Sequence, residues 1–204
     1  AQGRVNSTFS RYSRVRSMTG MTGAEAARRL LNAQGIYDVT VQQIAGELTD
    51  HYDPRTKTAN LSQSVYGATS VAAIGVAAHE CGHAMQDNEG YAPLRFRSAL
   101  VPVANFGSSL SWPLILLGLV FGGLGSPLVE IGILMFSLAV LFQLVTLPVE
   151  YNASARAVRL LDSQGILAGE EVSGTRKVLN AAALTYVAAA ATSILQLLRL
   201  IILF

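Results

Sequence analysis

The sequence contains a single cysteine, Cys81, among its 204 residues. One cysteine excludes an internal disulfide framework and any zinc module built from two or four cysteines, so a metal ion would have to be held mainly by histidine and carboxylate side chains. Charge is also scarce, because 14% of the residues are charged against about 25% in an ordinary soluble domain. With 51% hydrophobic residues, intrinsic disorder is excluded and a fully soluble globule is not expected.

Three stretches carry no charged side chain at all. They are residues 98–129, 131–149 and 178–198, with lengths of 32, 19 and 21 residues. A helix needs roughly 20 apolar residues to cross a bilayer, whereas a buried core helix seldom exceeds about 15 residues. We therefore predict three membrane-spanning helices in contact with a lipid bilayer. Pro102 and Pro113 interrupt the first stretch, so its spanning part is expected nearer Leu110 to Leu124.

The basic residues predict how the chain is oriented. A glycine-rich turn at 122–128 joins the first two stretches into a hairpin, which returns the chain to the side it left. Ten basic residues precede this hairpin, none lies in its turn, and four lie between it and the third stretch. Arg199, near the far end of the third span, runs against the rule, and one such residue is tolerable there. Because Lys and Arg stay preferentially on the cytoplasmic side, the residues before the hairpin and those after Val149 are expected to face the cytoplasm of the cell. The net charge of +2 is too small to indicate nucleic acid as a partner.

The first 97 residues are expected to form a compact part next to the membrane. A capping box at Thr22 to Glu25 opens an amphipathic helix that Gly35 closes. Strands are predicted at 39–44, at 47–52 and near 57–61, with a turn at 53–56. An alanine-rich helix follows from Thr69 to Gln86, and its almost wholly apolar first half predicts burial.

This buried helix contains His79-Glu80-Cys81-Gly82-His83, an H-E-x-x-H motif. Residues four apart lie one above the other at 3.6 residues per turn, so both imidazoles can reach a single ion. Glu80, about 100° round the helix, cannot join them as a ligand but can approach a water on the metal. Zinc lowers the pKa of such a water toward about 7, and the carboxylate can take its proton while the metal polarises a carbonyl. Cys81 lies off the ligand face and is expected to pack.

A catalytic zinc needs a third protein ligand, for which Glu150 and His51 are the candidates. Glu150 ends the second apolar stretch, and the hairpin returns it to the side of the motif helix. Ionisable groups near membrane spans are often functional, although a solvated carboxylate is the alternative reading. His51 lies among polar turn residues, which suit an exposed loop or a substrate-binding edge better. Glu150 is therefore the preferred third ligand.

Several segments together resemble known families. H-E-C-G-H followed by a membrane hairpin and E-Y-x-A is similar to the membrane zincins with a glutamate ligand, the HtpX heat-shock peptidases and prenyl-protein endopeptidases. Five segments more closely resemble the YugP-type neutral zinc metallopeptidases: TFSRYSRVRS at 8–17, LTDHYDPR at 48–55, AAHECGH at 77–83, LPVEYNAS at 147–154 and VLNAAALTY at 178–186. This resemblance covers nearly the whole chain. It implies a membrane-bound zinc peptidase with His79, His83 and Glu150 as ligands and Glu80 as general base.

The chain departs from the HtpX pattern four residues after Glu150. The HtpX-like enzymes have an aspartate there that orients a histidine, and this chain has Ser154. A serine could accept a hydrogen bond from an imidazole N–H but carries no charge, so further support could come from Asn152. Arg156, less than two turns beyond Glu150, could steady that carboxylate. The YugP-type family also resembles proteins with a further N-terminal membrane helix, which leaves open a fourth span before Ala1.

Other candidates concern the substrate. Residues 50–61 precede the motif helix, where related zincins place an edge strand that pairs with an extended peptide, so His51 and Tyr52 could border the substrate. An ordinary structural hairpin is the alternative. A donor to the oxyanion could come from Tyr186 or Asn180, although a tyrosine at this place is often only an interface anchor.

The sequence thus predicts a mainly α integral membrane protein of the cell membrane with a small β unit and a zincin-like site. Its expected segments are a cytoplasm-facing catalytic part at 1–98, a membrane hairpin at 99–149, a ligand-bearing helix and loop at 150–177 and a membrane helix at 178–204. The predicted function is zinc-dependent hydrolysis of peptide bonds in peptide or protein substrates, membrane proteins included. The alternatives are a membrane scaffold or chaperone-like protein with a structural or vestigial metal site, and a zinc hydrolase of other amides or esters. Two imidazoles and a carboxylate also accept other divalent ions, so the sequence leaves the metal open.

Overall fold

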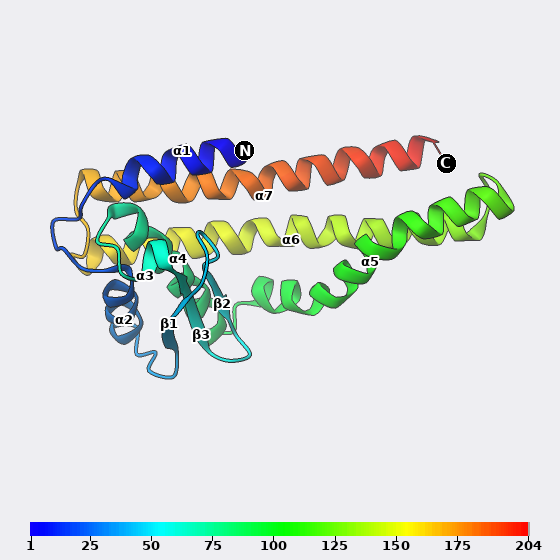
Figure 1. The fold of residues 1–204 in the computed structure, drawn as a ribbon. Helices are drawn as coiled ribbons and strands as arrows, with labels where there is room; N and C mark the ends of the chain where they lie inside the picture. The colour runs from blue at the N-terminus through cyan, green and yellow to red at the C-terminus, as the bar shows by residue number, and fades with distance from the viewer. Residues whose placement is uncertain (204) are drawn as a thin grey trace. The chain divides into compact units, whose positions relative to one another are not determined.

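The structure, a computed structural model, describes residues 1–203, and in that range it is mainly helical with one three-stranded sheet. The chain divides into two compact units (Figure 1). The first unit contains Ala1–Tyr91 and Val149–Thr185, and the second contains Ala92–Pro148 and the chain from Tyr186 onward. Two long helices, α6 (Pro127–Ser163) and α7 (Glu170–Leu203), contribute residues to both units.

The first unit begins with α1 (Gln2–Ser13) and α2 (Gly23–Ala33). The predicted capping box at the start of α2 is confirmed: the Thr22 hydroxyl accepts a hydrogen bond from the Glu25 amide, and the Glu25 carboxylate accepts one from the Thr22 amide. The chain leaves the helix near Gly35, whose φ of +69° suits a residue without Cβ. The apolar face of α2 is buried in the core.

A sheet in the order β1-β3-β2 follows, so β3 is central and β2 is an edge strand. β1 (Thr40–Ile44) runs parallel to β3 (Thr58–Ser62), and β2 (His51–Asp53) runs antiparallel to it. The prediction of a strand over 47–52 is wrong at its first four residues, which form a bend and loop. The physical reason is the left-handed backbone at Leu48, with a φ of +53°, because a residue in that conformation cannot continue an extended strand.

The motif helix is α4 (Val71–Asn88), which a short helix α3 (Gln63–Tyr66) precedes. The hydroxyl of Ser70 accepts a hydrogen bond from the Ala73 amide at 3.2 Å and caps the helix, so α4 starts two residues later than predicted. Most of its side chains are buried, including Ile74, Ala77 and Cys81. A helix that is buried nearly all round lies in the core of its unit, as its apolar sequence predicted.

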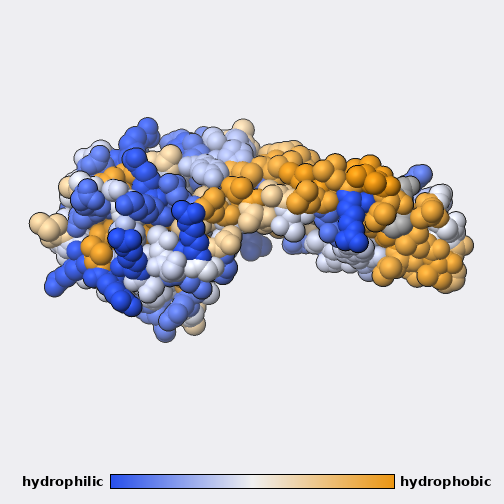
Figure 2. Space-filling model, turned by 90° about the horizontal axis from the view of Figure 1, so that it is seen from above, coloured by the Kyte–Doolittle hydropathy of each residue, from blue (hydrophilic) through white to orange (hydrophobic). Residues whose placement is uncertain are grey.

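The second unit consists of α5 (Ala92–Gly122), the first part of α6 and the last part of α7. By length and composition, α5, α6 and α7 are each long and apolar enough to cross a membrane. Figure 2 shows hydrophobic side chains gathered over the surface of the long helices. The helix α5 ends at Gly122, and Leu124, which we expected in the span, lies in the following turn because the chain turns at Gly123 with a φ of +75°.

The predicted hairpin is present as α5 and α6, which pack closely within the second unit. A Cβ on Gly132 would lie 2.9 Å from the Ser111 carbonyl oxygen and 2.6 Å from the side chain of Ile115. A Cβ on Gly118 would likewise lie 2.8 Å from the Val129 amide nitrogen. Small residues at such crossings let the backbones of membrane helices approach one another.

Candidate metal centre

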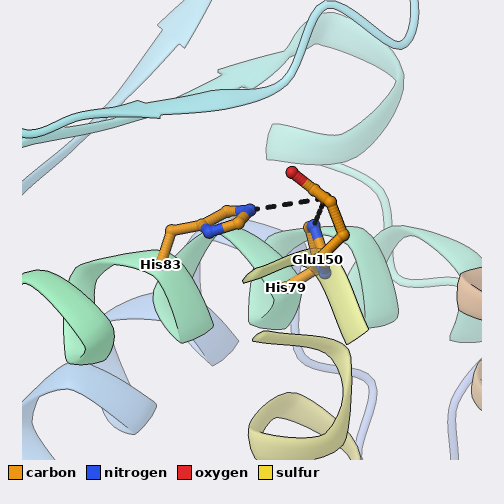
Figure 3. Close-up of side chains that lie close together, drawn as sticks. All are labelled: His79, His83 and Glu150. Carbon is orange, nitrogen blue, oxygen red and sulfur yellow. Dashed lines mark hydrogen bonds and ion pairs between the residues drawn. The ribbon is translucent and has the colours of Figure 1, made fainter. Parts of the chain in front are cut away.

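Three side chains of the first unit converge on one point (Figure 3). His79 and His83 lie one turn apart on α4, and Glu150 comes from α6. The Oε2 atom of Glu150 lies 3.2 Å from Nε2 of His79 and 3.6 Å from Nε2 of His83. The nearest ligand atoms of the three residues all lie within 4.8 Å of one another. The structure therefore brings together both histidines of the motif and the glutamate that the hairpin was predicted to return.

This donor set fits a zinc ion. At zinc–ligand distances of about 2.0–2.2 Å, tetrahedral geometry separates neighbouring ligand atoms by about 3.4 Å, which the two Nε2–Oε2 distances bracket. Two imidazole nitrogens and one carboxylate oxygen are a ligand set of catalytic zinc, which leaves a fourth position open for water or substrate. The three residues would hold the ion on the face of α4 that is turned toward α6.

Hydrogen bonds to the far side of each imidazole favour this arrangement. Gln86 donates its amide Nε2 to the Val149 carbonyl oxygen at 2.8 Å, so its Oε1 must be the atom that accepts from Nδ1 of His83 at 3.0 Å. The proton of a neutral His83 is thereby fixed on Nδ1, and Nε2 keeps its lone pair for a metal. Ser154 Oγ lies 3.0 Å from Nδ1 of His79, where it can accept in the same way.

Sequence reasoning missed Gln86. Its side chain is fully buried and joins the two ligand-bearing helices, since its Nε2 also donates to Asn152 Oδ1 at 2.9 Å. A polar residue three positions after His83, in a helix whose first half is almost wholly apolar, was the available signal. Such a residue costs free energy unless it is hydrogen-bonded, and all of its partners lie around the site.

Glu80 is buried beside the three converging residues, with 6% of its surface exposed. Burial raises the pKa of Glu80, and the nearby charges of His79 and His83 lower it, with burial prevailing. Within residues 1–203 no side chain or amide hydrogen-bonds to its carboxylate. For Glu150, burial alone would raise the pKa, but hydrogen bonds with His79 and His83 hold it well below its usual range. The carboxylate of Glu80 is therefore the one left for a water or substrate.

The remaining candidates lie in different places. Asn152 accepts hydrogen bonds from Gln86 and, at 2.7 Å, from Arg156, which also pairs with Glu89 at 2.7 Å. Asn180 and Ser154 line a cavity of about 460 Å³ between α6 and α7 in the first unit. Tyr186 belongs to the second unit.

His51 and Tyr52 lie on the edge strand β2. The ring of His51 contacts the Thr49 carbonyl oxygen at 2.9 Å through Nδ1 and the Asn60 amide at 3.2 Å through Nε2, so the structure places it outside the converging group. Tyr52 donates its hydroxyl proton to Asp87 at 2.8 Å, and Lys57 pairs with the same carboxylate. The β2–β3 hairpin is thereby fastened to α4 one turn beyond His83.

Gly82 determines how closely α4 and α6 approach. A Cβ on this residue would lie 2.5 Å from the Ala153 carbonyl oxygen and 3.0 Å from two further backbone atoms of Ala153. We expect Gly82→Ala to lower the free energy of unfolding by about 1–3 kcal/mol, the range for overpacking, and to weaken zinc binding because Glu150 lies one turn before Ala153. Thermal unfolding and bound zinc per chain check this expectation.

The matched control is Gly3→Ala on α1, where a Cβ would meet nothing within 4 Å. That change should leave zinc content unaltered and stabilise the helix slightly, by about 0.5–1 kcal/mol. An unfolding temperature of Gly82→Ala equal to that of the wild type would contradict the close approach of the two helices.

Comparison with known proteins identifies the family of the chain. The family described as "Putative neutral zinc metallopeptidase" matches residues 1–204. A protein of Bacillus subtilis (strain 168), named "Putative membrane protease YugP", is 50% identical over 204 residues, which are 100% of this chain and 90% of that protein. No solved structure was found to match. The resemblance expected from the sequence motifs is confirmed, and the chain belongs to the neutral zinc metallopeptidase family.

Proposed function

We propose that the protein is a membrane-bound zinc endopeptidase with His79, His83 and Glu150 as metal ligands and Glu80 as general base. The observation that carries the proposal is the convergence of the three ligand atoms next to a buried carboxylate that no described residue engages. A structural zinc site is closed by four protein ligands and needs no base beside the ion. Three ligands and a free carboxylate favour catalysis over the scaffold alternative.

Each of these residues has its own role in peptide hydrolysis. When bound, zinc supplies a Lewis acid that polarises the scissile carbonyl and acidifies water. Glu80 takes a proton from the attacking water and passes it to the departing amine, which is general base followed by general acid catalysis. Gln86 and Ser154 hold the two imidazoles with Nε2 toward the ion. Asn180, which lines the same cavity as Ser154, is the proposed donor to the oxyanion.

The edge strand β2 offers a place for an extended peptide. Within residues 1–203 its only sheet neighbour is β3, so the backbone groups on its other side are left for a peptide that binds as an added strand. Tyr52 and Lys57 fix this hairpin to α4 through Asp87. A peptide on β2 would lie along the motif helix, which makes peptides or proteins, membrane proteins among them, the proposed substrates.

The site is proposed to face the cytoplasm at the cell membrane. The three long apolar helices and the printed name of the Bacillus subtilis relative support membrane attachment. Basic residues lie on both sides of the α5–α6 hairpin and none lies in its turn, which supports a cytoplasmic location for the first unit.

Metal analysis and a degradation assay test the proposal. Protein purified without chelator should contain about one zinc ion per chain, as the three-ligand site requires, and should degrade casein. Removal of the metal with 1,10-phenanthroline should stop the hydrolysis, and added zinc should restore it. Protein without bound metal, or casein degradation that the chelator leaves unchanged, would overturn the proposal.

A further inference from the structure

A second feature of the first unit is the place where α1 packs along α7 (Figure 1). A Cβ on Gly174 of α7 would lie 2.7 Å from the ring of Tyr12 on α1, so the two helices touch. Next to this contact is a cavity of about 240 Å³ whose lining comes from these two helices.

The cavity is lined by cations from both helices. Arg4, Thr8 and Arg11 are four and three residues apart and share one face of α1, while Lys177 contributes from α7. Within residues 1–203, no acidic residue lines the cavity. In the same part of the chain, no carboxylate lies within 4.0 Å of the side-chain nitrogens of Arg4, Arg11 or Lys177. Three like charges on facing helices repel one another, and an anion between them would turn that repulsion into attraction.

The position of the cavity along α7 identifies the kind of anion. Lys177 is the last charged residue before the charge-free stretch 178–198. This is the depth at which a spanning helix meets the phosphate groups of a bilayer. Ala181 and Leu184 continue the lining on the apolar side, which suits an acyl chain better than it suits a soluble anion.

We propose that Arg4, Arg11 and Lys177 form a binding site for the phosphate headgroup of an anionic membrane lipid, which ties α1 to α7. Thr8 adds a hydroxyl donor to the phosphate, and the acyl chains lie along Ala181 and Leu184. Basic pockets between helices at the cytoplasmic boundary of a membrane are suited to such headgroups.

The test uses the full chain in an uncharged detergent and measures thermal unfolding together with native mass spectrometry of bound lipid. Phosphatidylglycerol should raise the unfolding temperature by about 3–6 °C and remain bound, while phosphatidylcholine and inorganic phosphate at the same concentration should have little effect. The variant Arg4→Gln/Arg11→Gln/Lys177→Gln should lose most of the shift. The control Arg14→Gln/Arg28→Gln/Arg55→Gln removes the same charge from exposed positions outside the cavity. This control should keep the rise in unfolding temperature with phosphatidylglycerol.

Several outcomes would overturn the proposal. The first is a variant Arg4→Gln/Arg11→Gln/Lys177→Gln whose unfolding temperature still rises fully with phosphatidylglycerol. The second is an equal loss of this rise in both triple variants. The third is a full rise with phosphatidylcholine or with inorganic phosphate alone. If the triple variant does not fold, Lys177→Gln and Arg55→Gln make the same comparison with one charge each. No readout requires bound zinc or hydrolysis, so a failure here is distinguishable from a failure of the proposed peptidase function.

Discussion

Replacing Glu80 by Gln is expected to reduce peptide hydrolysis by a factor of about 10²–10⁴ while zinc content stays at the wild-type amount. Glutamine has nearly the same shape as glutamate but cannot take a proton from water. Glu80 lies round the helix from His79 and His83, whose Nε2 atoms both face Glu150, so the change leaves all three proposed ligands in place. The measurement is casein or quenched-peptide cleavage together with elemental analysis of the same preparation.

Glu47→Gln is the matched control, because Glu47 is exposed in the loop between β1 and β2. This variant should keep wild-type hydrolysis and zinc content. Full activity in Glu80→Gln would falsify the assignment of Glu80 as general base. Loss of zinc together with activity would also contradict it, since the carboxylate would then be holding the metal.

The elements that local chemistry determines were predictable from the sequence. The capping box at Thr22 and Glu25 and the long charge-free stretches each depend on neighbouring residues or on composition, and the structure has them. The second strand was misplaced because an alternation of residue types cannot reveal the left-handed backbone at Leu48. The start of α4 was placed two residues early because the apolar pattern extends past the capping serine.

The site was predictable only in part, for a similar reason. The spacing of His79 and His83 fixes their common face through helix geometry alone. The approach of Glu150 required the hairpin, a long-range argument that the charge pattern happened to support. The bond between Gln86 and the Val149 carbonyl oxygen depends on the distance between two helices, which no local pattern encodes. No local pattern shows the role of Gly82 either, whose lack of a Cβ allows α4 and α6 to approach this closely.

Replacing Glu150 by Gln is expected to lower zinc affinity by more than about 100-fold, beyond the 10–100-fold loss typical of residues that only support a ligand. The carboxylate supplies the negative charge of the three-ligand set, and its Oε2 lies within 3.6 Å of both imidazole nitrogens. A neutral amide oxygen is a weaker donor to zinc, so two histidines would hold the ion almost alone. Titration of zinc into metal-free protein against a competing chelator measures the change.

Glu130→Gln is the control for this substitution, because it makes the same chemical change at an exposed position in the first turn of the same helix. Its zinc affinity should equal that of the wild type. Hydrolysis by Glu150→Gln should fall in proportion to the zinc that it loses, and zinc added in excess should recover part of it. A wild-type affinity in Glu150→Gln would mean that another residue completes the site, and the role of α6 in metal binding would have to be abandoned.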